Sequence, residues 1–162
     1  MSLQEIDALG LQAAIAQAKK SYSEGGIPIG SSLVHHPKGS TPKILAASHN
    51  QRIQKESATL HGEISALEAA GRLKAQIYRE STIYTTLSPC MMCTGAILLY
   101  KIPRVVIGEN KNFVGGEELL KSNGVEVIVL ENEECKELMT KFMQEKPEEW
   151  FEDIGEYTPG TD

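Results

Sequence analysis

The order of apolar and polar positions predicts strands that alternate with helices after an opening hairpin. Apolar side chains recur at helical spacing from about residue 4 to 22, and this run ends before Gly25-Gly26. The runs 29–34 and 44–50, separated by a turn rich in proline and glycine, predict an antiparallel hairpin. Later strands are predicted at 82–87, 104–108 and 125–130, and later helices from His61, from Pro89 or Cys90 to Tyr100, over 117–122 and 133–145, and after Pro147. The pattern indicates a three-layer α/β/α sandwich with a central mixed sheet of about five strands.

Composition adds limits on size, location and substrate. The 162 residues, 41% hydrophobic and 23% charged, suit one globular domain, so we expect residues 1–162 to form a single domain. The chain lacks a membrane-length apolar run and a signal-peptide pattern, so we expect no membrane association and a cytoplasmic location. A protein this small can also enter the nucleus. The net charge of -6 and the lack of a basic stripe favour a small neutral substrate over a nucleic acid.

Two short motifs supply ligands for one metal ion, namely 61–63 (His-Gly-Glu) and 89–93 (Pro-Cys-Met-Met-Cys). Cysteines three positions apart on a helix lie nearly on one face, so both sulfurs can reach one ion. A helix that starts at the proline directs its positive end at the thiolates. His61 adds a third ligand, and three protein ligands leave a fourth tetrahedral position for water, as in catalytic zinc sites. We therefore predict one Zn²⁺ per chain, held by His61, Cys90 and Cys93.

The alternative is a closed structural zinc site, which would need a fourth ligand. The available candidates are Cys135, His35, His36 and His49, and none is paired with another at ligand spacing. H-x-E followed by P-C-x-x-C is a signature of zinc nucleobase deaminases, which favours the catalytic interpretation. Glu63 would then take a proton from water and return it to the substrate, first at a ring nitrogen and later at the leaving amine. The alternative interpretation of Glu63 is an acidic residue that the positive end of a helix stabilises.

Three further residues have two interpretations each, and a fourth has one. Asn50 could form paired hydrogen bonds with a pyrimidine edge, or it could stabilise a turn. Trp150 and Phe151 could close over a ring, or they could pack in the core. Asp153 lies in an acidic C-terminal segment, where a solvated charge is the ordinary expectation.

A known family matches the chain at several places: 58–63, 87–90, 93–96, 25–30, 108–110, 112–113 and 150–156. These segments span nearly the whole chain and resemble the fungal cytosine deaminases of the cytidine and deoxycytidylate deaminase superfamily. Gly62 stands where relatives that act on tRNA adenosine usually carry alanine. Met91 departs from the acidic residue expected between the two cysteines.

The resemblance implies hydrolytic deamination of free cytosine to uracil and ammonia in pyrimidine salvage, by a zinc-dependent homodimer with a cytidine deaminase-like fold. It also implies that 5-substituted cytosines such as 5-fluorocytosine are accepted, and that the helix and tail over about 147–162 form a lid. By this resemblance, His61, Cys90 and Cys93 correspond to the family's zinc ligands, and Glu63 corresponds to its proton shuttle. The implied substrate-binding residues are Asn50, Gly62 through its backbone, Ile29, Leu87, Ser88, Phe113, Trp150, Phe151 and Asp153.

Three other functions stay open at this stage. The chain could deaminate another base or nucleoside, such as guanine or cytidine. It could be a zinc-stabilised interaction module without catalysis. RNA or DNA editing is a third possibility, and the acidic charge speaks against it.

Overall fold

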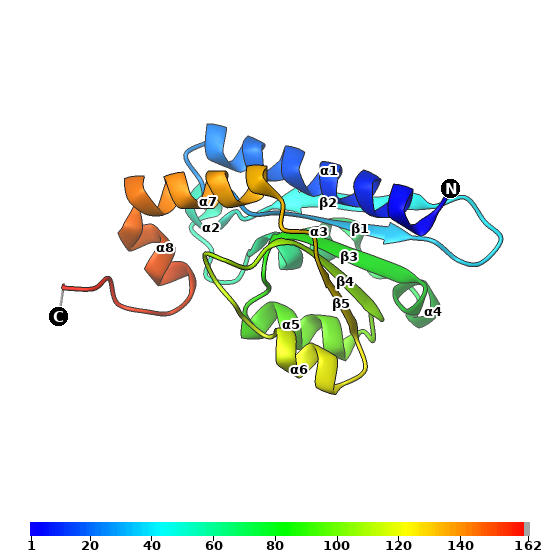
Figure 1. Ribbon diagram of the computed structural model, residues 1–162. Coiled ribbons are helices and arrows are strands. Elements are labelled where there is room, and N and C mark those ends of the chain that lie inside the picture. The colour runs from blue at the N-terminus through cyan, green and yellow to red at the C-terminus, as the bar shows by residue number, and fades with distance from the viewer. Residues whose placement is uncertain (161–162) are drawn as a thin grey trace.

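The computed structural model describes residues 1–160, whose central feature is a five-stranded mixed sheet between two layers of helices (Figure 1). The strand order is β2-β1-β3-β4-β5, and β1 runs antiparallel to β2 and β3 while β3, β4 and β5 are parallel. Every residue of β3 is buried, as expected for a central strand covered on both faces. The strands are β1 (Gly30–His35), β2 (Lys43–His49), β3 (Ser81–Leu87), β4 (Arg104–Glu109) and β5 (Glu126–Val129). The predicted mixed sheet of five strands is confirmed.

The helices form two layers, because neighbouring residues of each strand point to opposite faces of the sheet. On one face, Val34 and Tyr84 pack beneath α1 (Leu3–Ser23) and α7 (Glu133–Glu145). On the other face, Leu33 and Ile83 pack against the layer formed by α3, α5 and α6. The remaining helices are α2 (Arg52–Lys55), α3 (Gly62–Ala70), α4 (Ala75–Arg79), α5 (Met91–Leu99), α6 (Glu117–Ser122) and α8 (Pro147–Asp153). The predicted three-layer sandwich is therefore confirmed.

A buried ion pair joins α1 to the sheet. Asp7 accepts hydrogen bonds from Arg104 Nη1 at 2.5 Å and Nη2 at 2.7 Å, and from the Tyr84 hydroxyl at 2.8 Å. Gly10, one turn further along α1, has no room for a side chain, because a Cβ there would overlap the Tyr84 ring. These contacts hold the first half of α1 tightly against β3 and β4.

The last helix, α8, lies beside the end of β3 from which the chain continues into α5. Trp150 of α8 packs with Met139 and Phe142 of α7 and with Ile29 and Leu87 at the sheet. This third apolar cluster fixes α8 beside the turn that carries Cys90. Among residues 1–160, no helix combines the length and apolarity that crossing a membrane requires.

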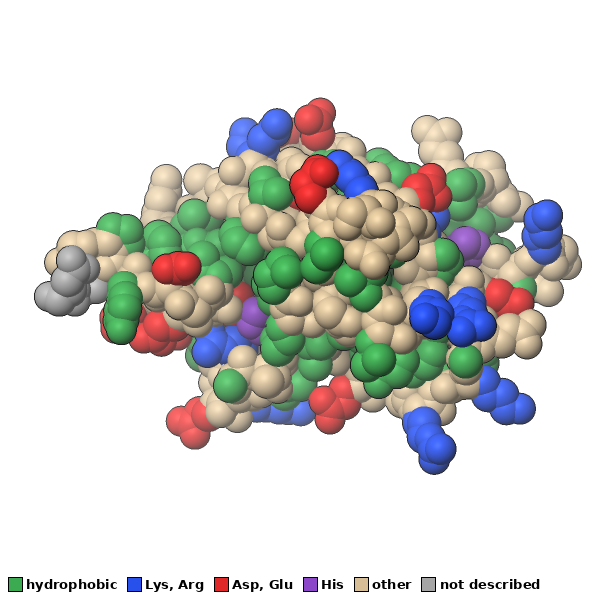
Figure 2. Space-filling view, turned by 90° about the horizontal axis from the view of Figure 1, so that it is seen from below, with side chains coloured by type: hydrophobic (Ala, Val, Ile, Leu, Met, Phe, Trp, Pro, Cys, Tyr) green, Lys and Arg blue, Asp and Glu red, His purple; other side chains and the backbone are tan. Residues whose placement is uncertain are grey.

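The layer formed by α3, α5 and α6 exposes apolar side chains on its outer side, which faces away from the sheet. Figure 2 views the molecule from this side and shows hydrophobic patches between charged residues. Leu99 and Tyr100 at the end of α5 are exposed, as is Met91 at its start. A groove between α3 and α5 has Leu67, Leu73, Tyr78, Ala96 and Leu99 among its lining residues.

Candidate active site

Both metal-ligand motifs lie at the N-termini of helices. His61 is the N-cap of α3 and Cys90 is the N-cap of α5, and both have extended backbone conformations. The prediction that His61 and Cys90 lie within the helices was therefore wrong by one residue, and Pro89 precedes the N-cap. The chain has to leave strand β3 through extended residues before a helix can start. Cys93 is the third residue of α5, so its sulfur still lies at the same helix end as Cys90.

The three predicted ligands converge on one point. Ligand atoms of His61, Cys90 and Cys93 all lie within 4.8 Å of one another. The distance from Cys90 Sγ to His61 Nδ1 is 3.4 Å, whereas tetrahedral zinc geometry places such atoms about 3.6 Å apart. Two sulfurs and one imidazole are also a donor set that zinc prefers. The side chains present thus fit a zinc ion with a fourth position left over.

Protonation of the three ligands in the metal-free protein is uneven. A hydrogen bond from Cys93, with a further one from His61, lowers the pKa of Cys90 to about 4 despite its burial. The same Cys90–Cys93 bond and burial raise the pKa of Cys93. Burial lowers the pKa of His61, but the bond to Cys90 and the charges of Asp153 and Glu63 outweigh it and raise the value to about 9. At neutral pH the metal-free site therefore holds one thiolate, one thiol and an imidazolium.

Glu63 lies on the first turn of α3, beside the metal ligands and shielded from solvent. Only 3% of the residue is exposed, and this burial raises the pKa of its carboxyl group. The Thr85 hydroxyl donates a hydrogen bond to Glu63 Oε1 at 2.6 Å. A buried carboxyl whose pKa is raised binds a proton more tightly than a solvated one does, which suits a group that accepts a proton from water.

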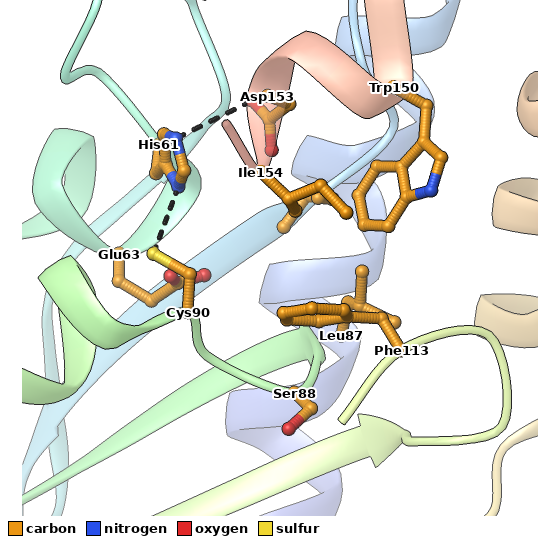
Figure 3. Close-up of a pocket in the computed structure, with 10 residues that line it drawn as sticks. His61, Glu63, Leu87, Ser88, Cys90, Phe113, Trp150, Asp153 and Ile154 are labelled. Atoms are coloured by element: carbon orange, nitrogen blue, oxygen red, sulfur yellow. Dashed lines mark hydrogen bonds and ion pairs between the residues drawn. The ribbon is translucent and has the colours of Figure 1, made fainter. Parts of the chain in front are cut away.

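A small pocket adjoins the metal ligands and Glu63 (Figure 3). Its lining combines five apolar side chains with five polar or titratable ones, as is usual for a site that binds a small molecule. The lining residues are Ile29, His61, Glu63, Leu87, Ser88, Cys90, Phe113, Trp150, Asp153 and Ile154. Of the predicted site residues, Asn50, Gly62, Cys93 and Phe151 are not in this lining. Ile154 is in the lining and was not predicted.

Asn50 and Asp153 meet at the edge of this cavity. Asn50 is fully buried, its Nδ2 donates to Asp153 Oδ1 at 2.8 Å, and its Oδ1 accepts from the backbone N–H of Arg52 at 3.0 Å. The turn-forming interpretation of Asn50 thus describes this structure. One hydrogen and one lone pair of the amide are not used by these two bonds.

Asp153 is not the solvated charge that its acidic surroundings led us to expect. It is 6% exposed, because α8 folds back over the site, and its Oδ1 lies 3.5 Å from His61 Nε2 and 3.7 Å from Arg52 Nη1. Burial raises the pKa of the Asp153 carboxyl, against the opposing effects of His61 and Asn50. A carboxylate next to the second nitrogen of a ligand histidine is a common way to orient that ring.

Aromatic side chains close the other side of the cavity. The Phe113 and Trp150 rings meet edge to face, with centroids 5.7 Å apart. Trp150 is almost fully buried, so it both packs in a core cluster and lines the cavity. Phe151 packs at the border of that cluster only. Gly62 allows a close approach here, because a Cβ would come within 3.1 Å of the Ile29 carbonyl oxygen.

Buried acids that the sequence did not single out hold the loops of the site. Ser88 donates to Glu117 Oε2 at 2.6 Å and accepts from the Gly115 N–H at 3.0 Å. Glu109 accepts bonds from the Asn112 backbone at 3.1 Å and side chain at 2.8 Å, which fixes the loop that carries Phe113. The two Ser88 contacts span 29 and 27 positions, so no local pattern could indicate them, whereas the Glu109–Asn112 contacts span only three positions.

The fold, the zinc-type ligand cluster and the adjoining buried glutamate together define a zinc-dependent deaminase class of site. A family model for the cytidine and deoxycytidylate deaminase zinc-binding region matches residues 4–109, and the chain belongs to this family. The resemblance to that superfamily and the expected zinc cofactor are thereby confirmed.

Individual relatives agree with this assignment. The chain is similar to the cytosine deaminase of Candida albicans, with 63% identity over 93% of this chain and 97% of the relative. It is 33% identical to the tRNA-specific adenosine deaminase of Bacillus subtilis, over 86% of this chain and 89% of that one. A solved structure of a tRNA:A34 deaminase is 25% identical with a TM-score of 0.67, covering 81% of this chain and 99% of the other.

Proposed function

We propose that this protein catalyses the hydrolytic deamination of free cytosine to uracil and ammonia. The observation that carries the proposal is the position of buried Glu63 beside the metal ligands, in the lining of a small pocket. The 63% identity to a cytosine deaminase along nearly the whole chain supports the choice of base.

The metal would be held by His61, Cys90 and Cys93. Bound zinc supplies Lewis acidity that makes water nucleophilic near neutral pH. Glu63 takes the proton from that water and delivers it to ring N3 of cytosine, which makes C4 electrophilic. Hydroxide adds to C4, and the same carboxyl then takes the proton of the new C4 hydroxyl and passes it to the departing amine, so one water is consumed and one ammonia is released.

The other cavity residues would orient the base and exclude bulk water. Leu87, Phe113 and Trp150, with Ile29, offer apolar walls to the ring faces. Asn50 and the backbone N–H of Gly62 would hold one polar edge of the pyrimidine. We expect Asp153 and Ser88 to contact the exocyclic amine, and Phe151 to support Trp150. Since the walls are apolar, a small 5-substituent as in 5-fluorocytosine would be accepted.

The proposal includes a single domain whose C-terminal segment, about 147–162, acts as a lid. Support comes from α8 and the residue after it, which bring Trp150, Asp153 and Ile154 to the cavity. Residues 161 and 162 of that segment lie outside the described part of the chain. Whether the lid opens during turnover can be tested through substrate access.

We also infer a homodimer that works in pyrimidine salvage, in the cytoplasm with access to the nucleus. The groove between α3 and α5, with exposed Leu99 and Tyr100 at its rim, offers an apolar face for a second copy. Sedimentation of the wild type and of Leu99→Lys tests this: a dimer that becomes monomeric supports the face, and unchanged mass excludes it.

The main experiment measures ammonia and uracil release from cytosine by zinc-loaded protein. Glu63→Ala should keep its zinc and its fold and lose turnover, whereas Glu68→Ala, an exposed glutamate on the same helix, should retain it. Cytidine and guanine serve as competing substrates. Faster turnover of cytidine than of cytosine would overturn the choice of substrate, and no turnover on any base despite bound zinc would indicate a non-catalytic zinc module.

A further inference from the structure

The two oxygens of the Glu63 carboxylate have different surroundings. Oε1 accepts a hydrogen bond of 2.6 Å from the Thr85 hydroxyl. Among the hydroxyl groups of residues 1–160, that of Thr85 is the one that hydrogen-bonds to Glu63. Thr85 belongs to β3, whereas Glu63 belongs to α3. The Cys93 side chain also hydrogen-bonds to the Glu63 carboxyl, but Cys93 is a metal ligand whose sulfur would be taken up by a bound zinc ion.

Thr85 is placed to hold its partner firmly. The residue is 0% exposed, in the middle of the fully buried strand β3. Its hydroxyl has one proton and two acceptors within reach, Glu63 Oε1 at 2.6 Å and the Leu87 carbonyl at 3.0 Å. A distance of 2.6 Å is typical of a hydroxyl that donates to a carboxylate, so the proton belongs to the bond with Glu63.

Thr85 is also separate from the substrate's surroundings. It is not among the residues that line the cavity, while Glu63 and Leu87 are. An effect of Thr85 on the reaction would therefore pass through Glu63. Strand β3 is central and paired on both sides, so it offers a rigid base for that contact.

We propose that Thr85 is a positioning residue that engages Oε1 of Glu63 and so leaves Oε2 as the oxygen that exchanges protons with water and substrate. The inference rests on the proposed deaminase function. A glutamate side chain has three rotatable bonds, and a carboxylate that shifts by about 1 Å can lose about 100-fold in rate. Fixing one oxygen removes most of that freedom at the proton-transfer step.

The test compares three variants at two positions of β3. Thr85→Val removes the hydroxyl and keeps the shape, so kcat on cytosine should fall about 10-fold to 100-fold while KM changes less than about threefold. Thr85→Ser keeps the hydroxyl and should return kcat to within about threefold of the wild type. Thr82→Val is the matched control, because Thr82 is equally buried on β3 but bonds His36 at 2.6 Å, away from the site.

A second readout does not depend on turnover. In zinc-loaded protein at a fixed free zinc concentration, a double-mutant cycle of Glu63→Ala and Thr85→Val should show non-additive losses of unfolding free energy, as expected for groups in direct contact. Additive losses, a Thr85→Val enzyme with wild-type kcat, or equal loss of kcat in Thr82→Val would overturn the proposal. If the wild type deaminates no base, the proposed function fails, and the cycle still decides whether the Thr85–Glu63 contact exists.

Discussion

Replacing Asp7 by asparagine should destabilise the protein strongly although Asp7 lies far from the active site. The substitution keeps the size of the side chain and removes the charge that pairs with Arg104, whose side chain is only 7% exposed. Asp7 accepts three hydrogen bonds, two from the Arg104 guanidinium and one from the Tyr84 hydroxyl. The new amide group would instead point N–H donors at one of these two donor groups. A buried charge that loses its partner typically costs 3–5 kcal/mol, so we expect about that loss in the free energy of unfolding.

The expected loss can be read in two assays. For a chain of 162 residues, about 1 kcal/mol corresponds to roughly 2–4 °C in Tm, so the Tm should fall by roughly 6–20 °C. Urea unfolding at a fixed free zinc concentration gives the free energy directly, since bound metal adds to apparent stability. The activity of the remaining folded protein should be unchanged at 25 °C.

Glu126 provides the matched control for this prediction. It also pairs with Arg104, through Nε at 3.2 Å, but its side chain is 60% exposed. Glu126→Gln should therefore cost less than about 1 kcal/mol. A loss below about 1 kcal/mol in Asp7→Asn, or equal losses in the two variants, would refute the reasoning that the buried charge decides the outcome.

Two further predictions concern the metal site. Zinc binding at pH 7 should release about two protons, from the Cys93 thiol and the His61 imidazolium, because the pKa of both is raised while that of Cys90, about 4, leaves it already ionised. Since zinc competes with these protons, affinity should rise steeply with pH up to about 9, the pKa of His61, and less steeply above it, where the Cys93 thiol still holds its proton. Calorimetry in two buffers of different ionisation enthalpy counts the protons. A count near zero or three would contradict the assignment. Asp153→Asn should weaken zinc binding about 10-fold, because Asp153 orients His61, and chelator competition measures this. An affinity equal to that of Glu152→Gln, a change at the exposed neighbouring residue, would show that Asp153 does not orient the ligand.

The regular elements were largely predictable because their patterns are long and local. The helices over 117–122 and 133–145 have the predicted limits, and each strand differs by at most two residues at an end. The helices α2 and α4 were missed, because four or five residues show no helical period. The metal ligands were predictable because their spacing itself encodes the geometry.

Contacts between distant segments could not be predicted in this way. Asp153 lies 103 positions from Asn50 in the chain, and only the return of α8 over the site buries it. Thr85 is an ordinary strand residue by its pattern, although a hydroxyl at an inward position of a buried strand is a weak signal. Its bond to Glu63 depends on how α3 lies against β3.

The N-cap positions of His61 and Cys90 have a consequence for the unfolded chain. The two residues are 29 positions apart, and the segment between them contains α3, α4 and the central strand β3. An ion that binds both residues closes this segment into a loop, much as a disulfide would. For a loop of that length the lost chain entropy corresponds to about 3.5 kcal/mol at 25 °C. The catalytic ion would therefore also act as a cross-link around the central strand, restricting the unfolded ensemble in addition to its part in the reaction.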